Sequence, residues 1–243
     1  PITAVIDGTV QTFPNAAEEE AFRAGHEAKH AENYRINSFH LGEGSPKQKF
    51  RANMDAIYTL KTLENQNRDA TPEEQETLAN YVGWGGLADA FDAEKTAWAG
   101  EYKELKAALT EEEYAAARAS TLNAHYTSPT VIRAIYEALD GMGFEKGNIL
   151  EPSMGVGNFF GMLPDSMLGS RLYGVELDSI TGRIAQKLYP QAEVKVAGFE
   201  TTDHRDFYDL AVGNVPFGNY RVSDKPYDKL GFSIHNYFFA KAL

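Results

Sequence analysis

Cysteine is absent from the 243 residues of the chain, which excludes disulfide bonds and thiolate metal sites. No apolar run approaches the roughly 18 residues that a membrane span needs. Residues 1–4 lack the basic stretch and apolar block that begin a secretory signal. His125, Asp203 and His204 show no spacing typical of metal ligands. We therefore expect a cytoplasmic protein without a membrane partner or a bound metal.

Positive charge is also scarce, since 23 Lys and Arg residues face 35 Asp and Glu residues and the formal net charge is −12. This balance argues mildly against a large nucleic-acid surface in this chain, because DNA affinity comes mostly from phosphate neutralisation. The acids gather in three runs, Glu18–Glu20, Glu73–Glu76 and Glu111–Glu113, each near an expected helix start. Acids suit the positive end of a helix dipole, so these runs are interpreted as solvated helix N-termini.

The first half of the chain, residues 1–120, is expected to be an all-helical N-terminal region. Capping patterns predict helices over residues 15–31, 45–67, from 71, and 110–119. The second of these helices carries one apolar stripe, formed by Phe50, Met54, Ile57, Leu60 and Leu63.

The segment Gly83-Trp84-Gly85-Gly86 is unusual, because glycines beside a tryptophan permit close backbone approach or positive φ. Two interpretations remain open. In the first, the segment is a tight turn between helices with Trp84 inserted into the core. In the second, Trp84 lies near a ligand or DNA.

The second half, residues 121–243, alternates strands with helices. Strands are expected at residues 148–151, 171–176, 193–196 and 208–213, and helices at 128–139, from 158, at 179–188 and from 235. This alternation is typical of right-handed βαβ units in an open parallel sheet. The sequence therefore predicts an α/β fold with a Rossmann-like sheet.

A strand that runs into a glycine-rich loop and then a helix spans Glu151–Phe159. In a doubly wound sheet, a nucleotide-like ligand binds at such a loop. Glu176 ends the next strand about twenty residues later, where it would hold ribose hydroxyls. A carboxylate beside the loop disfavours the pyrophosphate of NAD, whereas the cationic ammonium and sulfonium of S-adenosylmethionine tolerate it.

A second motif follows the last strand, at Asn214-Val215-Pro216-Phe217. The proline stiffens the loop and so fixes a side-chain amide, a backbone carbonyl and an aromatic ring relative to one another. Two of these groups can accept the two protons of an exocyclic amine, while the ring stacks on its base.

With these motifs in this order, the second half resembles the γ-class N6-adenine DNA methyltransferases, which include type I modification subunits. A Thr-x-Pro segment comes first, here in Tyr126-Thr127-Ser128-Pro129, and the loop of Asn214 comes last. The first half, through Trp84-Gly85-Gly86-Leu87, resembles the N-terminal part of the methylase–helicase proteins of conjugative elements and phages. The resemblance implies a methyltransferase core at residues 121–243, cofactor-binding residues Thr127, Glu151, Pro152, Gly155, Gly157, Asn158, Phe159, Glu176 and Phe199, and catalytic residues Asn214, Val215, Pro216 and Phe217.

Two positions depart from the family pattern. Val215 replaces the first of two prolines, which keeps the carbonyl acceptor but loses some stiffness. Gly198-Phe199 replaces an Asp-Phe pair whose Asp binds the cofactor's adenine amine, although Phe199 can still stack and Glu200 or Asp203 can substitute.

The resemblance implies transfer of a methyl group from S-adenosylmethionine to N6 of an adenine flipped out of DNA. Two other functions compete with it. The first is a non-catalytic scaffold or DNA-binding module of a mobile-element protein. The second is a methyltransferase that acts on RNA or on protein glutamine, because the same loop geometry serves amide nitrogens.

Four expected strands are fewer than the seven usual in this family, so the sheet is expected to be incomplete. An unfinished edge favours pairing with another chain. The resemblance implies DNA as a partner. The unfinished edge adds a second copy of the chain or the remainder of a longer, helicase-like polypeptide.

Overall fold

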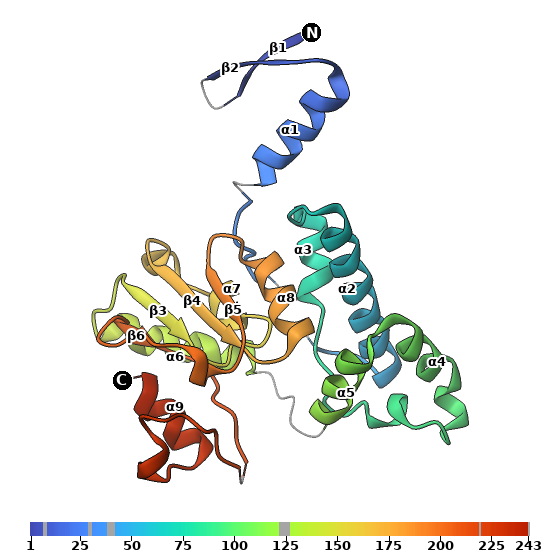
Figure 1. Ribbon diagram of the computed structural model, residues 1–243. Helices are drawn as coiled ribbons and strands as arrows, with labels where there is room; N and C mark the ends of the chain where they lie inside the picture. Colours follow the sequence, from blue (N-terminus) through green and yellow to red (C-terminus); the bar gives the residue numbers. More distant parts are fainter. Residues whose placement is uncertain (7–8, 29–30, 38–41, 122–126, 219, 243) are drawn as a thin grey trace.

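The computed structural model describes residues 1–6, 9–28, 31–37, 42–121, 127–218 and 220–242. Tyr126 of the expected Thr-x-Pro segment lies outside these ranges. Besides short 3-10 helices, the described elements are β1 (Ile2–Ile6), β2 (Thr9–Phe13), α1 (Ala16–Ala28), α2 (Pro46–Gln66), α3 (Pro72–Ala79), α4 (Ala99–Ala108), α5 (Glu111–Ser120), α6 (Pro129–Gly141), β3 (Asn148–Glu151), α7 (Asn158–Gly161), β4 (Arg171–Glu176), α8 (Ser179–Leu188), β5 (Glu193–Val196), β6 (Leu210–Ala211) and α9 (Ile234–Ala242) (Figure 1).

The second half contains a parallel sheet with strand order β5-β4-β3-β6 in the described residues. Residues alternate between its faces, so Ile149 of β3 packs with α6, α7 and α8, while Leu150 packs with α9. Every strand is parallel to its neighbour, and their carboxyl ends therefore meet at one edge. This α/β arrangement confirms the fold class expected from the sequence.

In the first half, α2, α3 and α5 begin where capping residues predict, whereas α4 was not expected and begins after Trp98 without a side-chain cap. Ser45, Thr71 and Thr110 each accept a hydrogen bond from the backbone N–H three residues on, and the Gln or Glu there bonds back. The apolar stripe of α2 is fully buried, with exposed fractions of 0–1% from Phe50 to Leu63. These caps and this stripe explain why the helices lie as expected.

Residues 2–13 correct the expectation of an all-helical first region. There β1 and β2 form an antiparallel pair, with Ile2 opposite Phe13 and Ala4 opposite Gln11. Phe22 of α1 packs against Phe13, with ring centroids 5.1 Å apart. The hairpin and α1 stand apart from the rest of the molecule (Figure 1).

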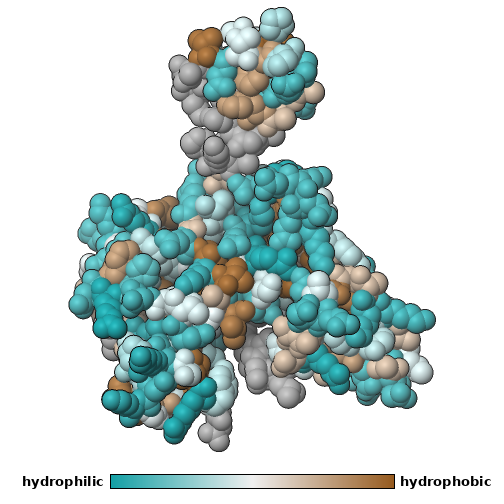
Figure 2. Space-filling model, viewed as in Figure 1, coloured by the Kyte–Doolittle hydropathy of each residue, from teal (hydrophilic) through white to brown (hydrophobic). Residues whose placement is uncertain are grey.

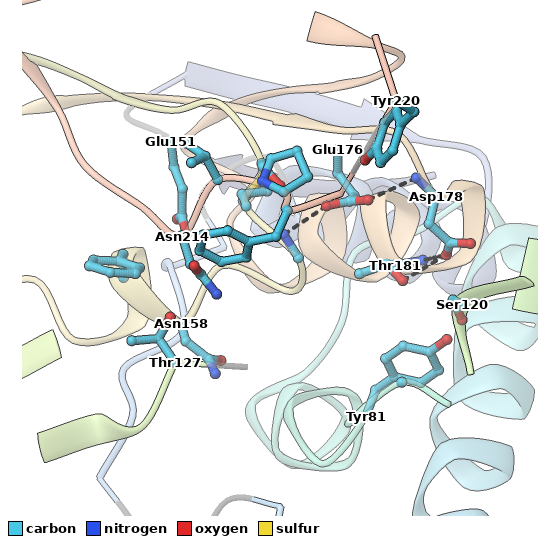
Figure 3. Close-up of a pocket in the computed structure, with 18 residues that line it drawn as sticks. Tyr81, Ser120, Thr127, Glu151, Asn158, Glu176, Asp178, Thr181, Asn214 and Tyr220 are labelled. Carbon is cyan, nitrogen blue, oxygen red and sulfur yellow. Dashed lines mark hydrogen bonds between the residues drawn. The ribbon is translucent and has the colours of Figure 1, made fainter. Parts of the chain in front are cut away.

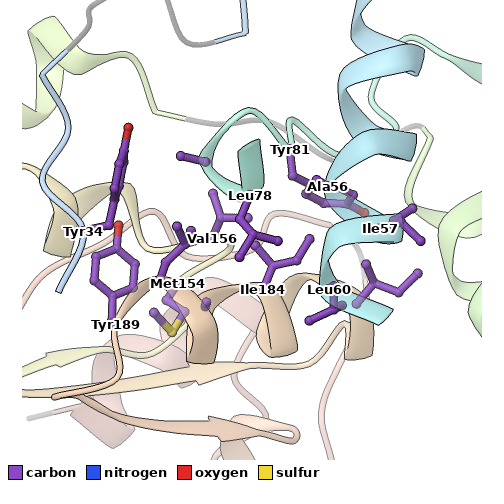
Figure 4. Close-up of a cluster of buried hydrophobic side chains, with 14 of the residues drawn as sticks. Tyr34, Ala56, Ile57, Leu60, Leu78, Tyr81, Met154, Val156, Ile184 and Tyr189 are labelled. Carbon is purple, nitrogen blue, oxygen red and sulfur yellow. The ribbon is translucent and has the colours of Figure 1, made fainter. Parts of the chain in front are cut away.

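One hydrophobic core joins the helical half to the sheet half. Leu60 of α2 and Leu78 of α3 are fully buried with Ile184 of α8 (Figure 4). The backbone also connects the halves, since the N–H of Tyr34 donates to the carbonyl of Leu188 at 2.8 Å. α2 and α3 are therefore packed against the sheet half, whereas the hairpin and α1 are not part of this core.

Much of the face shown in Figure 2 is hydrophilic, and hydrophobic residues gather in its middle, between the two halves. Among the helices that the structure describes, none combines the length and the apolar character of a membrane span.

Candidate functional site

A pocket of about 400 Å³ lies at the carboxyl edge of the sheet, where β3, β4 and β6 end (Figure 3). Its lining comes from the sheet half and from the helical half together. The lining residues are Tyr81, Gly83, Ser120, Thr127, Glu151, Ser153, Met154, Gly155, Asn158, Phe159, Glu176, Asp178, Thr181, Asn214, Val215, Pro216, Phe217 and Tyr220.

The glycine-rich loop follows β3 and takes backbone conformations that favour glycine. Gly155 has φ of +57° and Gly157 has φ of +83°. A Cβ on Gly157 would also collide with the ring of Tyr189, so this position requires glycine. Gly155, Asn158 and Phe159 line the pocket, whereas Pro152 and Gly157 do not line it.

Glu176 at the end of β4 is held by the loop that it faces. Its Oε2 accepts a hydrogen bond from the backbone N–H of Gly155 at 2.8 Å, and its Oε1 accepts one from Asp178 at 2.8 Å. Burial raises the pKa of Glu176, while these two hydrogen bonds oppose the rise. Each carboxylate oxygen can accept a further hydrogen bond. Glu176 can therefore bind hydroxyl donors from a ligand.

Glu151 at the end of β3 is the buried acid of the pocket, with only 2% of its surface exposed. Its Oε2 has no hydrogen-bond partner among the described residues. Burial raises the pKa of Glu151 well above its ordinary value, and the charge of Glu176 adds to the rise. A buried, unsatisfied carboxyl oxygen beside a pocket is expected to have a ligand partner.

The loop Asn214–Phe217 follows β6 and forms another side of the pocket. The backbone N–H of Val212 donates to the carbonyl of Leu150 at 2.9 Å, which ties this strand to β3. Asn214 consequently lies near the carboxyl group of Glu151 (Figure 3). Phe217 is 69% exposed, so its ring is available at the pocket mouth.

The helical half supplies lining that sequence reasoning missed, at Tyr81, Gly83 and Ser120. Asn53, buried on α2, holds this part of the wall in place. Its Nδ2 donates to the carbonyl of Gly83 at 2.6 Å, and its Oδ1 accepts from the N–H of Val82 at 2.8 Å. The glycines at 83–86 were the available signal, but nothing local connects them to strands more than 60 residues away.

Trp84 itself does not line the pocket. It is 1% exposed and packs edge-on against Phe91, with centroids 5.2 Å apart. The structure therefore favours the first interpretation of this segment, a turn with its tryptophan in the core.

Not every residue implied by the resemblance reaches the pocket. Thr127 lines it, but Phe199 is 4% exposed and packs against Phe238 of α9, with ring centroids 5.1 Å apart. The cluster under α9 also contains Leu150 and Val175, so Phe199 is part of a buried core and does not line the pocket. Within the described residues, no group of three or more His, Asp or Glu side chains is arranged to hold a metal ion.

Sequence comparison finds two curated relatives that each match part of the chain. No protein-family model matches the chain. The chain is 29% identical over 192 residues to the defense against restriction protein B of Escherichia phage P1, covering 76% of this chain and 7% of that protein. It is 33% identical over 92 residues to the type II methyltransferase M.CvrRI of Paramecium bursaria Chlorella virus XZ-6E, covering 38% of this chain and 24% of that protein.

Among solved structures, a Listeria monocytogenes protein assigned to the class I S-adenosylmethionine-dependent methyltransferases aligns with a TM-score of 0.39 and 13% identity, covering 80% of this chain and 69% of that one. The chain spans only a small part of the two curated relatives, about 7% and 24% of their lengths. By sequence, then, it is similar to part of a phage protein named for defence against restriction and to part of a viral methyltransferase.

Proposed function

We propose that the chain binds S-adenosylmethionine in the pocket at the strand ends and transfers its methyl group to N6 of adenine in DNA. One observation carries the proposal: the pocket brings the loop of Asn214 beside the glycine-rich loop and the acids Glu151 and Glu176. The name of the viral relative supports methyl transfer as the reaction class.

The residues of the pocket fit this cofactor. The unpartnered, buried carboxyl of Glu151, once ionised, matches a ligand that carries positive charge and would repel a phosphate. The oxygens of Glu176 can accept hydrogen bonds from two ribose hydroxyls, and Gly155 allows the close approach that this requires. When bound, the cofactor supplies an electrophilic methyl group on a sulfonium.

Asn214 and Val215 are suited to hold an exocyclic amine. Asn214 Oδ1 and the Val215 carbonyl would accept hydrogen bonds from the two N6 N–H groups, so that the nitrogen lone pair leaves ring conjugation and points into the pocket. The change from proline to valine at 215 leaves this carbonyl unaltered. Phe217, exposed at the mouth, would stack on the flipped base. Catalysis by these groups is chiefly positioning.

The test is radiolabelled methyl transfer to duplex DNA by the purified chain, followed by nuclease digestion and identification of N6-methyladenine. Asn214→Ala should lower the rate roughly 100-fold or more, as when one positioned polar group is removed from an active site. Asn80→Ala is the matched control, because Asn80 is exposed, its side chain donates to the Glu76 carbonyl at 2.9 Å, and it does not line the pocket.

Equal rates for wild type and Asn214→Ala would refute the role of the loop. If RNA and protein are offered as well and only RNA or a protein glutamine becomes labelled, that molecule is the substrate in place of DNA. Cofactor binding without transfer to any of these substrates would favour the non-catalytic scaffold.

A further inference from the structure

A second hollow of about 720 Å³ adjoins the pocket on the far side of Glu176. One side is the face of α5, and the other is the segment from Glu176 into α8. Its lining is Thr110, Glu112, Glu113, Ala116, Ala119, Ser120, Glu176, Leu177, Asp178, Ser179, Ile180 and Arg183. Ser120, Glu176 and Asp178 line both spaces, so a ligand held at Glu176 can extend into each.

Each of the two walls of this hollow includes apolar side chains. Ala116 and Ala119 of α5 form one wall, and both are exposed to the hollow. Leu177 belongs to the other wall and is 77% exposed, so its side chain is free to contact a ligand in the hollow. Two apolar walls suit the flat face of a heterocyclic base.

Ion pairs across the hollow fix the distance between its walls. Arg183 of α8 pairs with Glu113 of α5 through one nitrogen and with Glu64 of α2 at 3.0 Å through another. Lys61 also contacts Glu113, at 3.3 Å. Because Glu113 and Arg183 both line the hollow, these pairs hold it open at a set width before any ligand binds.

The charges of the hollow select among nucleotides. Glu112, Glu113, Glu176 and Asp178 line it, while Arg183 is its one cationic lining residue within the described part of the chain and is already paired. Such a surface repels phosphate groups but not an uncharged base and ribose. A nucleoside without phosphates therefore fits better than ATP or a dinucleotide.

We propose that this hollow binds the adenine base of S-adenosylmethionine, with Ala116, Ala119 and Ser120 of α5 as the wall that the helical half contributes. The inference rests on the proposed function, because it assigns the ribose to Glu176. It makes the helical half part of the cofactor site.

The test compares two tryptophan substitutions on α5. Ala119→Trp fills the hollow, whereas Ala115→Trp places the same side chain on an exposed position of the same helix that does not line it. Calorimetry with S-adenosylmethionine should show about a tenfold or greater loss of affinity for Ala119→Trp and less than about a twofold change for Ala115→Trp. Matching melting temperatures would show that both variants fold.

A second measurement uses 5′-methylthioadenosine, which keeps the base and ribose but lacks the amino-acid part of the cofactor. Ala119→Trp and Leu177→Ala should both weaken its binding, and ATP should bind the wild type far more weakly. Tight S-adenosylmethionine binding that is equal in wild type and Ala119→Trp would overturn the inference while leaving the proposed function intact. Failure of the wild type to bind S-adenosylmethionine would overturn both.

Discussion

At the scale of single residues, Glu151 connects stability to binding. Its raised pKa means that the folded chain holds a proton that the unfolded chain releases near pH 4.5. The stability contributed by this group is complete below that pH and is lost as pH rises through the folded pKa. The same carboxyl, once ionised, is the partner that a cationic ligand needs.

Glu151→Gln should therefore stabilise the ligand-free chain at pH 8 much more than at pH 5, by about 1.4 kcal/mol for each pH unit above 4.5 over which the folded wild type keeps this carboxyl protonated while the unfolded chain ionises it. It should also weaken S-adenosylmethionine binding roughly tenfold at pH 8 and remove the dependence of affinity on Glu151 ionisation. Urea unfolding and calorimetry at both pH values measure these effects. Glu145→Gln, at an exposed position, is the control, and a variant that is less stable than wild type at pH 8 would contradict the prediction.

Residues that follow a strand directly could be predicted as a site, because parallel strands end at one edge. Glu151, Glu176 and Asn214 were found in this way. Tyr81 and Ser120 could not be, since Tyr81 follows α3 and Ser120 ends α5, and only the packing of two distant segments brings them to the pocket. Phe199 was expected in the cofactor site but lies in the core under α9 instead, because Tyr237 and Phe238 of that helix pack against it.

At the scale of elements, the turn after α3 depends on one side chain. Asn53→Ala would leave the carbonyl of Gly83 and the N–H of Val82 without partners in a buried place. Each loss costs about 1–3 kcal/mol, so we expect the free energy of unfolding to fall by about 3 kcal/mol.

Urea unfolding measures the change, with Asn80→Ala as control because it removes one bond at an exposed helix end. A fall no larger than that of Asn80→Ala would mean that water or a shifted backbone replaces Asn53.

Helices could be predicted closely because capping boxes are local signals, and Ser45, Thr71 and Thr110 all begin helices as expected. The pairing of residues 2–13 was missed although Asp7-Gly8, a dipeptide typical of tight hairpin turns, separates two β-branched runs. The last strand, β6, is shorter than its expected range of 208–213 because only Leu210 and Ala211 pair with β3.

At the scale of the whole molecule, the shared core predicts that the two halves unfold together. Leu78 of α3 is fully buried beside α8. Leu78→Ala should therefore destabilise both halves by the same amount, about 3 kcal/mol.

Trp84 and Trp98, the two tryptophans of the chain, report by fluorescence on the helical half alone. Hydrogen exchange at the amides of β3 reports on the sheet half. Coincident transitions are expected in wild type and variant. Protection of β3 that outlasts the fluorescence change would show that the halves unfold separately.

The packing of the two halves against each other could not be predicted from the sequence, although most helices and strands within each half were. Patterns of apolar residues show that α3 and α8 each have a face to bury, but not that they bury it against each other. That pairing joins positions such as Leu78 and Ile184, which no local period relates.

The packing of α2 and α3 against α8 has a consequence for folding during synthesis. The apolar faces of α2 and α3 leave the ribosome before α8, their covering helix, which ends roughly 100 residues later. At about 5–20 residues per second, those faces wait roughly 5–20 seconds for their partner. During that interval the nascent helical half presents Leu60 and Leu78 to the cell without their native cover, which makes it a natural client for chaperones.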